Sequence, residues 1–195
     1  MIDALTAHLR GIWQLAFGQM QGARLFGAER RDVMRSFLAL AIVLPAELAQ
    51  KIDVWALFPA TAPLTDLLLL RGLAVETLTC LVSWLGFLVV AYELCRLLHR
   101  EHRWCWLVIL WNWSQVVQAT LALAANLPDL MGAPSVAGQI MLLLSLGWAI
   151  WFDWKIVRIS LAVPMLDAAL FVAIDAVISN AAPVLTAHLD HLISG

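Results

Sequence analysis

Charged residues are scarce in this sequence. Of its 195 residues, 12 are Lys or Arg and 14 are Asp or Glu, whereas 63% are apolar and the mean hydropathy is +0.85. About a quarter of a soluble domain is charged, and a chain this apolar cannot hide its large side chains from water. These proportions exclude a water-soluble fold. The net charge of −2 also excludes nucleic acid as a partner, because phosphate binding depends on surplus Lys and Arg.

The sequence also lacks the motifs of catalytic and metal sites. Its three cysteines have no C-x-x-C spacing and predict neither a zinc site nor a disulfide framework. No nucleophile elbow, phosphate-binding loop, dinucleotide fingerprint or H-E-x-x-H sequence is present, and no apolar run holds a histidine that could bind haem. Two H-x-x-H pairs, at 99–102 and 188–191, fall on opposite sides of a five-span bundle and cannot complete one metal site. We therefore expect no enzymatic activity, no cofactor and no metal.

Long apolar runs make up most of the remaining chain. A helix needs about 20 residues to cross a bilayer, and a chain in lipid must satisfy its backbone hydrogen bonds internally. The sequence therefore predicts an all-α, polytopic transmembrane bundle of about five spans within residues 31–180. The first span contains Pro45, which is tolerated where neighbouring helices satisfy the freed backbone groups. The predicted spans are about 33–50, 73–98, 104–127, 136–158 and 164–180.

The first 30 residues have the pattern of an amphipathic helix rather than a span. Apolar residues recur at three- and four-residue intervals, with polar side chains between them. We expect residues 1–30 to lie in the membrane interface with Trp13 and Phe17 in the acyl boundary. Docking in a groove of a partner protein is the alternative. Spaced leucines also predict a second amphipathic segment in the C-terminal tail, residues 181–195.

Basic residues are unequally divided between the two sides of the predicted bundle. Only Lys51 and Arg71 lie on one side, and the other Lys and Arg residues lie on the opposite side, with the N-terminal segment. Because cytoplasmic loops are rich in Lys and Arg, we expect a bacterial inner-membrane protein with a cytoplasmic N-terminus. Aromatic residues at the predicted interfaces should contact lipid or a partner. These are Trp13, Phe17, Trp104, Trp106, Trp148, Trp151 and Trp154.

The third predicted span carries amide side chains at every third position, Asn112, Gln115 and Gln118. Unpaired amides are costly in hydrocarbon, so this stripe should face the bundle interior. It could hold helices together through hydrogen bonds, or it could line a path for an ion, water or a lipid headgroup.

Asp175 lies near the middle of the last predicted span, where an acidic residue is a functional candidate. We expect a protonated side chain bonded to Gln115 or Asn112. Asp167, earlier on the same helix, is the second titratable group that a proton relay would need, but its place in the first helical turn is equally well explained by the helix dipole.

The order of segments resembles that of the Yip-type five-helix membrane proteins and their small bacterial relatives. The residues that carry the resemblance are Arg35 to Leu40 (RSFLAL) with Pro45, and Trp111 to Gln115 (WNWSQ). The resemblance concerns the layout of most of the chain, and it implies a non-enzymatic membrane component. It assigns no functional residue.

Two functions are therefore compatible with the sequence. The first is a non-catalytic accessory or assembly subunit of a larger membrane complex, in contact with the lipid bilayer and with protein partners. The second is a small proton- or ion-coupled transporter or channel that uses the amide stripe and Asp175.

Overall fold

The computed structural model describes residues 2–57, 66–130 and 135–194. These residues form helices and connecting turns without strands, which confirms the predicted all-α class. The helices are α1 (Ile2–Ala16), η1 (Met20–Leu25), α2 (Arg30–Ser36), α3 (Leu38–Leu57), α4 (Asp66–Leu97), η2 (Glu101–Arg103), α5 (Trp104–Leu130), α6 (Ser135–Leu161) and α7 (Met165–Ser194).

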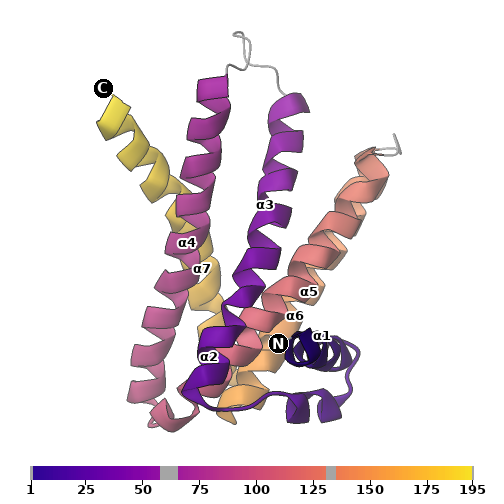
Figure 1. Ribbon diagram of the computed structural model, residues 1–195, viewed down its shortest axis with the longest axis vertical. Helices are drawn as coiled ribbons and strands as arrows, with labels where there is room; N and C mark the ends of the chain where they lie inside the picture. The colour runs from indigo at the N-terminus through magenta and orange to yellow at the C-terminus, as the bar shows by residue number, and fades with distance from the viewer. Residues whose placement is uncertain (1, 58–65, 131–134, 195) are drawn as a thin grey trace.

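The long helices α3 to α7 run up and down the long axis of the molecule, and α1 lies across their lower end (Figure 1). Within the described residues, four helices are long and apolar enough to cross a membrane, as expected for a multi-pass membrane protein. Their apolar stretches are Leu69–Leu97, Glu101–Pro128, Val136–Leu161 and Met165–Thr186.

The helix at the first predicted span differs from the predicted segment 33–50. Residues 33–36 belong to α2, the chain turns at Phe37, and α3 then continues to Leu57. The Ser36 hydroxyl donates a 2.7 Å hydrogen bond to the Val33 carbonyl at this break. α3 carries Glu47, Lys51 and Asp53 and is not among the four apolar helices. A bundle of five spans therefore stays a prediction, in which α3 would be the additional span.

The last helix also differs from its predicted boundary at residue 180. α7 continues without a break from Met165 to Ser194, so the predicted tail 181–195 begins as part of the same helix. The reason is packing, because Ala182 and Thr186 are buried. The hydroxyls of Thr79 on α4 and Thr186 on α7 lie 2.6 Å apart and join the two helices beyond residue 180.

α5 is the central helix of the bundle. Of its apolar stretch 61% is buried within the protein, against 17–22% for those of α4, α6 and α7. Leu107, Ile109, Leu110 and Trp113 are fully buried. The outer helices expose their apolar side chains instead, which suits lipid contact.

α1 packs closely on η1 and on the bundle. Ile12 and Leu15 are fully buried, whereas Phe17, beyond the end of the helix, is exposed. A Cβ at Gly22 would lie 2.9 Å from the Cβ of Gln14 and still closer to the Gly11 carbonyl, so only glycine permits this crossing. Lys155 of α6 donates a 2.7 Å hydrogen bond to the Leu15 carbonyl. A cation suits this position because a helix C-terminus carries partial negative charge.

His8 is the titratable group buried where α1 docks. Its ring stacks on Phe26 at 5.2 Å and lies 5.4 Å from the ring of Trp113. Burial lowers the pKa of His8 below its usual value, an effect that nearby Asp32 opposes and Arg35 strengthens. The docked helix therefore favours neutral imidazole.

We expect α1 to dock less tightly in acid. The pKa of His8 is lower when α1 is docked than when it is undocked. Neutral His8 therefore stabilises the docked helix fully above the pKa of an undocked histidine, about 6.5. This stabilisation is lost as the pH falls toward the pKa of the docked state. Hydrogen exchange of α1 amides, corrected for intrinsic rates, should therefore show lower protection at about pH 5 than at about pH 7.5. The variant His8→Phe keeps the ring contacts without titrating and should lose this pH dependence; equal pH dependence in both proteins would contradict the assignment.

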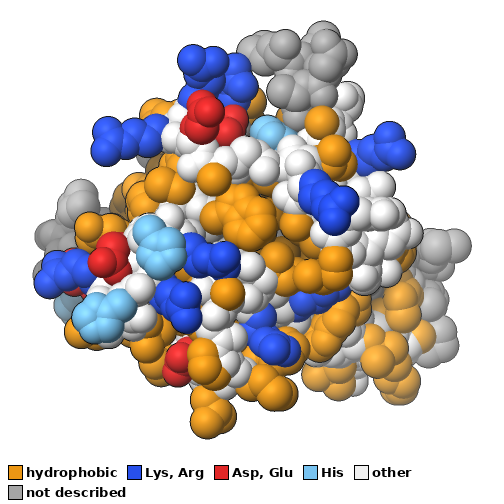
Figure 2. All heavy atoms as spheres, turned by 90° about the horizontal axis from the view of Figure 1, so that it is seen from below, with side chains coloured by type: hydrophobic (Ala, Val, Ile, Leu, Met, Phe, Trp, Pro, Cys, Tyr) orange, Lys and Arg blue, Asp and Glu red, His pale blue; other side chains and the backbone are white. Residues whose placement is uncertain are grey.

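The lower end of the molecule, where α1 lies, is also the basic end. Figure 2 shows this end from below, with Lys and Arg side chains spread over its surface among exposed apolar groups. The N-terminal elements, the turn from α4 to α5 and the turn from α6 to α7 all meet here (Figure 1). The basic residues that the sequence assigns to one side of the membrane thus gather at one end of the fold.

Candidate functional site: a carboxylate-lined cavity

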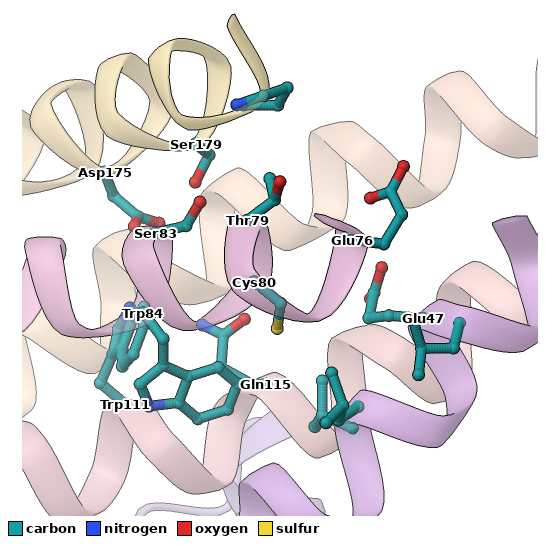
Figure 3. A pocket seen from close by; sticks show the side chains of 14 residues that line it. Glu47, Glu76, Thr79, Cys80, Ser83, Trp84, Trp111, Gln115, Asp175 and Ser179 are labelled. Atoms are coloured by element: carbon teal, nitrogen blue, oxygen red, sulfur yellow. The ribbon is translucent and has the colours of Figure 1, made fainter. Parts of the chain in front are cut away.

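A cavity of about 260 Å³ lies between α3, α4, α5 and α7, within the apolar stretches of the last three helices. Its lining is unusually polar for this position, because it combines carboxyl, hydroxyl, thiol and amide groups. The polar lining residues are Glu47, Glu76, Thr79, Cys80, Ser83, Gln115, Asp175 and Ser179 (Figure 3). Polar groups at this depth are expensive and mark candidate functional sites.

Helical periodicity brings these groups to the cavity. On α4, Glu76, Thr79 and Ser83 are three and four residues apart, a spacing that places side chains on one helix face. On α7, Asp175 and Ser179 are one turn apart, and Pro183 follows at the same interval. The cavity is therefore formed by two polar helix faces, closed by α3 and α5.

The carboxyl groups lie at two ends of the cavity. Figure 3 shows Asp175 beside Ser83 and Ser179 at one end, and Glu47 and Glu76 at the other. Of these residues, the sequence predicts Asp175 as a functional candidate but not Glu47, Glu76 or the hydroxyls. The signal that could have identified them is the polar spacing on α4 and α7, which a search for apolar runs passes over.

The three amides of the predicted stripe have different surroundings. Asn112 is fully buried, donates a 2.8 Å hydrogen bond to the Ser36 hydroxyl and accepts one of 2.9 Å from Trp84 Nε1. Gln115 lines the cavity. Gln118 donates to Asp153 Oδ1 at 2.7 Å. The stripe divides because each third residue falls about 60° short of a full helical turn.

Asp175 and Gln115 line the same cavity, but the predicted hydrogen bond between them is not formed. Among the described residues, neither side chain has a hydrogen-bond partner, and Asn112 is already bonded to Ser36 and Trp84. Asp167 lies in the first turn of α7, half-buried and away from the cavity. The geometry thus favours the helix-dipole interpretation of Asp167.

Asp153 is an acid whose surroundings the sequence does not predict. It lies between Trp151 and Trp154, two of the aromatic residues that the sequence places at the membrane interface. The side chain is instead 7% exposed and bonded to Gln118. α5 covers this position, and packing between helices distant in sequence is not encoded in the local pattern.

The predicted interfacial aromatics belong to α1 and its following turn, the start of α5 and the second half of α6. Phe17 and Trp151 are exposed, and the other five are partly buried. Several have polar or aromatic partners, since Trp154 Nε1 donates to the Met165 carbonyl at 3.1 Å and Trp148 stacks on Phe152 at 4.8 Å. Contact with lipid or a partner stays a prediction for all seven. They are Trp13, Phe17, Trp104, Trp106, Trp148, Trp151 and Trp154.

The part of the chain that the structure describes contains no group of three His, Cys, Asp or Glu residues able to hold a metal ion. The side chains of His99, His102 and His188 are exposed. The cavity nevertheless has the chemistry to bind protons or a small hard cation, because carboxylates and hydroxyls offer oxygen ligands and exchangeable protons.

Comparison with known proteins gives no relative, since no family model, curated protein or solved structure matches the chain.

Proposed function

We propose that this chain is a small proton- or cation-coupled transporter or channel. The observation that carries the proposal is the position of Asp175 with Glu47, Glu76 and three hydroxyl side chains around one cavity inside the bundle. Carboxylates in a membrane segment cost free energy that packing alone does not recover, and in membrane proteins they mark proton relays and ion paths. The observed geometry therefore supports the second of the two functions compatible with the sequence.

We further propose that the protein lies in a bacterial inner membrane with the basic end in the cytoplasm. The exposed residues Arg24, Arg31, Arg96 and Arg158 belong to the elements and helix ends that meet there. The positive-inside rule then puts α1 at the cytoplasmic surface. In this orientation, Glu47 and Glu76 lie on the outer side of Asp175, so the cavity leads from the bundle centre toward the outside.

Proton flux in proteoliposomes tests the proposed function. Vesicles that hold the purified protein and a trapped pH-sensitive dye receive a potassium diffusion potential through valinomycin. We expect the internal pH to change faster than in protein-free vesicles. The same comparison with an imposed sodium or potassium gradient tests whether the protein carries a cation other than the proton. Rates equal to those of protein-free vesicles for all three cations would contradict the proposal.

The accessory-subunit function is a second proposal, and the outer surface of α6 favours it. Leu142, Leu143, Leu144 and Leu146 are all more than half exposed. An exposed apolar helix face of this kind can bind a neighbouring transmembrane helix as well as lipid. The resemblance in layout to Yip-type proteins, which implies a non-enzymatic membrane component, agrees with this function.

Purification from native membranes in mild detergent tests the second proposal. We expect a stable co-migrating protein if α6 contacts a partner helix. The matched variant Leu143→Asn should reduce the recovered partner, because an exposed amide disfavours an apolar contact. A monodisperse monomer without a co-migrating protein would contradict the accessory function.

A further inference from the structure

Asp153 is a buried carboxyl group outside the cavity described above. It lies on α6 with 7% of its surface exposed, and Gln118 Nε2 of α5 donates a 2.7 Å hydrogen bond to its Oδ1. The hydroxyl of Ser114, also on α5 and fully buried, interacts with the same carboxyl. Two polar groups one helical turn apart on α5 thus surround one acid inside the bundle.

The groups facing Asp153 include one carboxyl and, among the described residues, no cation. α5 contributes the uncharged Gln118 and Ser114, and α7 contributes Asp175, which is close enough to interact electrostatically with Asp153. Lys155, two residues further along α6, donates instead to the Leu15 carbonyl and lies 5.0 Å from the Trp151 ring.

Arg158 does not neutralise Asp153 either, because its guanidinium lies over the Trp154 ring at 4.8 Å. Two carboxylates that interact inside a protein repel each other, and a strongly interacting pair titrates as a unit. A proton shared by Asp153 and Asp175 would remove this repulsion, which neither Lys155 nor Arg158 offsets.

The two acids lie at similar depth on adjacent helices. At a rise of about 1.5 Å per residue, Asp153 is about 12 Å from the lower end of α6, and Asp175 is about 15 Å from the lower end of α7. Asp175 lines the cavity, whereas Asp153 does not. Asp153 is therefore the acid further from the cavity, inside the bundle.

We propose that Asp153 is a second proton-binding site, which exchanges a proton with Asp175 and extends the path from the cavity into the bundle. In the exchange, the Asp153 carboxyl loses its proton and becomes a carboxylate, while the Asp175 carboxylate accepts that proton. This inference rests on the proposed proton-coupled function for its role in transport, but the protonation of Asp153 can be measured without transport.

A purely structural role is the competing explanation, in which the bond to Gln118 only holds α5 against α6. The variant Asp153→Asn separates the two roles, because its Oδ1 can still accept the hydrogen bond from Gln118 but the amide cannot bind the proton. Asp167→Asn is the matched control, since Asp167 is an acid at the lower end of α7 and lies away from both sites.

Infrared titration of the protein in lipid vesicles tests the proposal directly. The wild-type protein should show protonated-carboxyl bands that disappear with rising pH, and Asp153→Asn should remove one of them. Asp175→Asn should remove another and change the midpoint of the Asp153 band, because the two groups interact. If Asp153→Asn has the same bands as the wild-type protein, or if Asp175→Asn leaves the Asp153 midpoint unchanged, the proposal is overturned.

Proton flux in proteoliposomes then separates this inference from the proposed function. We expect Asp153→Asn and Asp175→Asn each to lower the flux at least about a hundredfold, with the flux of Asp167→Asn unchanged. If Asp175→Asn alone abolishes flux, the proposed function stands and the exchange with Asp153 is overturned. If neither variant changes flux, the exchange is overturned and Asp175 has no role in transport. If the wild-type protein itself gives no more flux than protein-free vesicles, the proposed function fails, and the infrared bands alone decide whether Asp153 binds a proton.

Discussion

Replacing Asp175 with asparagine is expected to lower proton flux at least about a hundredfold, the smallest effect typical of losing a proton-transfer group. The substitution keeps the size of the side chain and its place beside Ser83 and Ser179 in the cavity. It removes the carboxyl proton, which an amide cannot replace at neutral pH. The measurement is the rate of internal pH change in the dye-loaded proteoliposomes.

Asp167→Asn supplies the matched control for this experiment. It makes the same chemical change on the same helix, but in the half-buried first turn of α7 and away from the cavity. We expect its flux to stay within about twofold of the wild-type rate, because surface charges are screened by solvent. Equal flux in the Asp175 variant, the Asp167 variant and the wild-type protein would remove Asp175 from the mechanism.

Replacing Asn112 with leucine is expected to destabilise the bundle by about 3 kcal/mol. Asn112 joins three helices, because it lies on α5, donates to Ser36 of α2 and accepts from Trp84 of α4. Leucine would remove both hydrogen bonds and leave the Trp84 N–H without its acceptor in a buried position. The unfolding free energy in mild detergent, followed by circular dichroism during denaturation, measures the loss.

Asn126→Leu is the control for the Asn112 variant. Asn126 also lies on α5 and donates a 3.0 Å hydrogen bond to Gln50, but the residue is only partly buried. We expect a loss below about 1 kcal/mol, because solvent can replace one partly exposed hydrogen bond. If both variants unfold at the wild-type denaturant concentration, the Asn112 network does not hold the bundle together.

The helical class and the gathering of basic residues at one end could be predicted from the sequence, because both follow from local composition. Apolar runs longer than about 18 residues indicate transmembrane helices regardless of their neighbours. The docking of α1 across the lower end agrees with its amphipathic pattern, although the crossing at Gly11 and Gly22 depends on η1, which the pattern does not reveal.

The candidate site could be predicted only in part, because it depends on which helix faces meet. Asp175 is conspicuous as a lone acid within an apolar run. Glu76 and Ser83 become significant only when α4 packs against α7, and Asp153 only when α5 covers it. Residue spacing gives the direction of a side chain around its own helix, but it does not identify the neighbouring helix.

A cavity that conducts protons or cations must admit water and ions, and Cys80 is a natural probe of this access. Cys80 lines the cavity and is partly exposed, whereas Cys95 on the same helix is fully buried. Reaction of a thiol with a polar reagent requires access to the sulfur. Two proteins that each retain one of these cysteines, with the other two replaced by serine, therefore form a matched pair.

The decisive measurement is the labelling of this pair by a membrane-impermeant methanethiosulfonate cation applied to the outer side of oriented vesicles. We expect the reagent to modify Cys80, whereas Cys95 should stay unmodified until the protein is denatured. A Cys80 thiol as unreactive as Cys95 in the folded protein, with both modified after denaturation, would contradict a cavity open to ions.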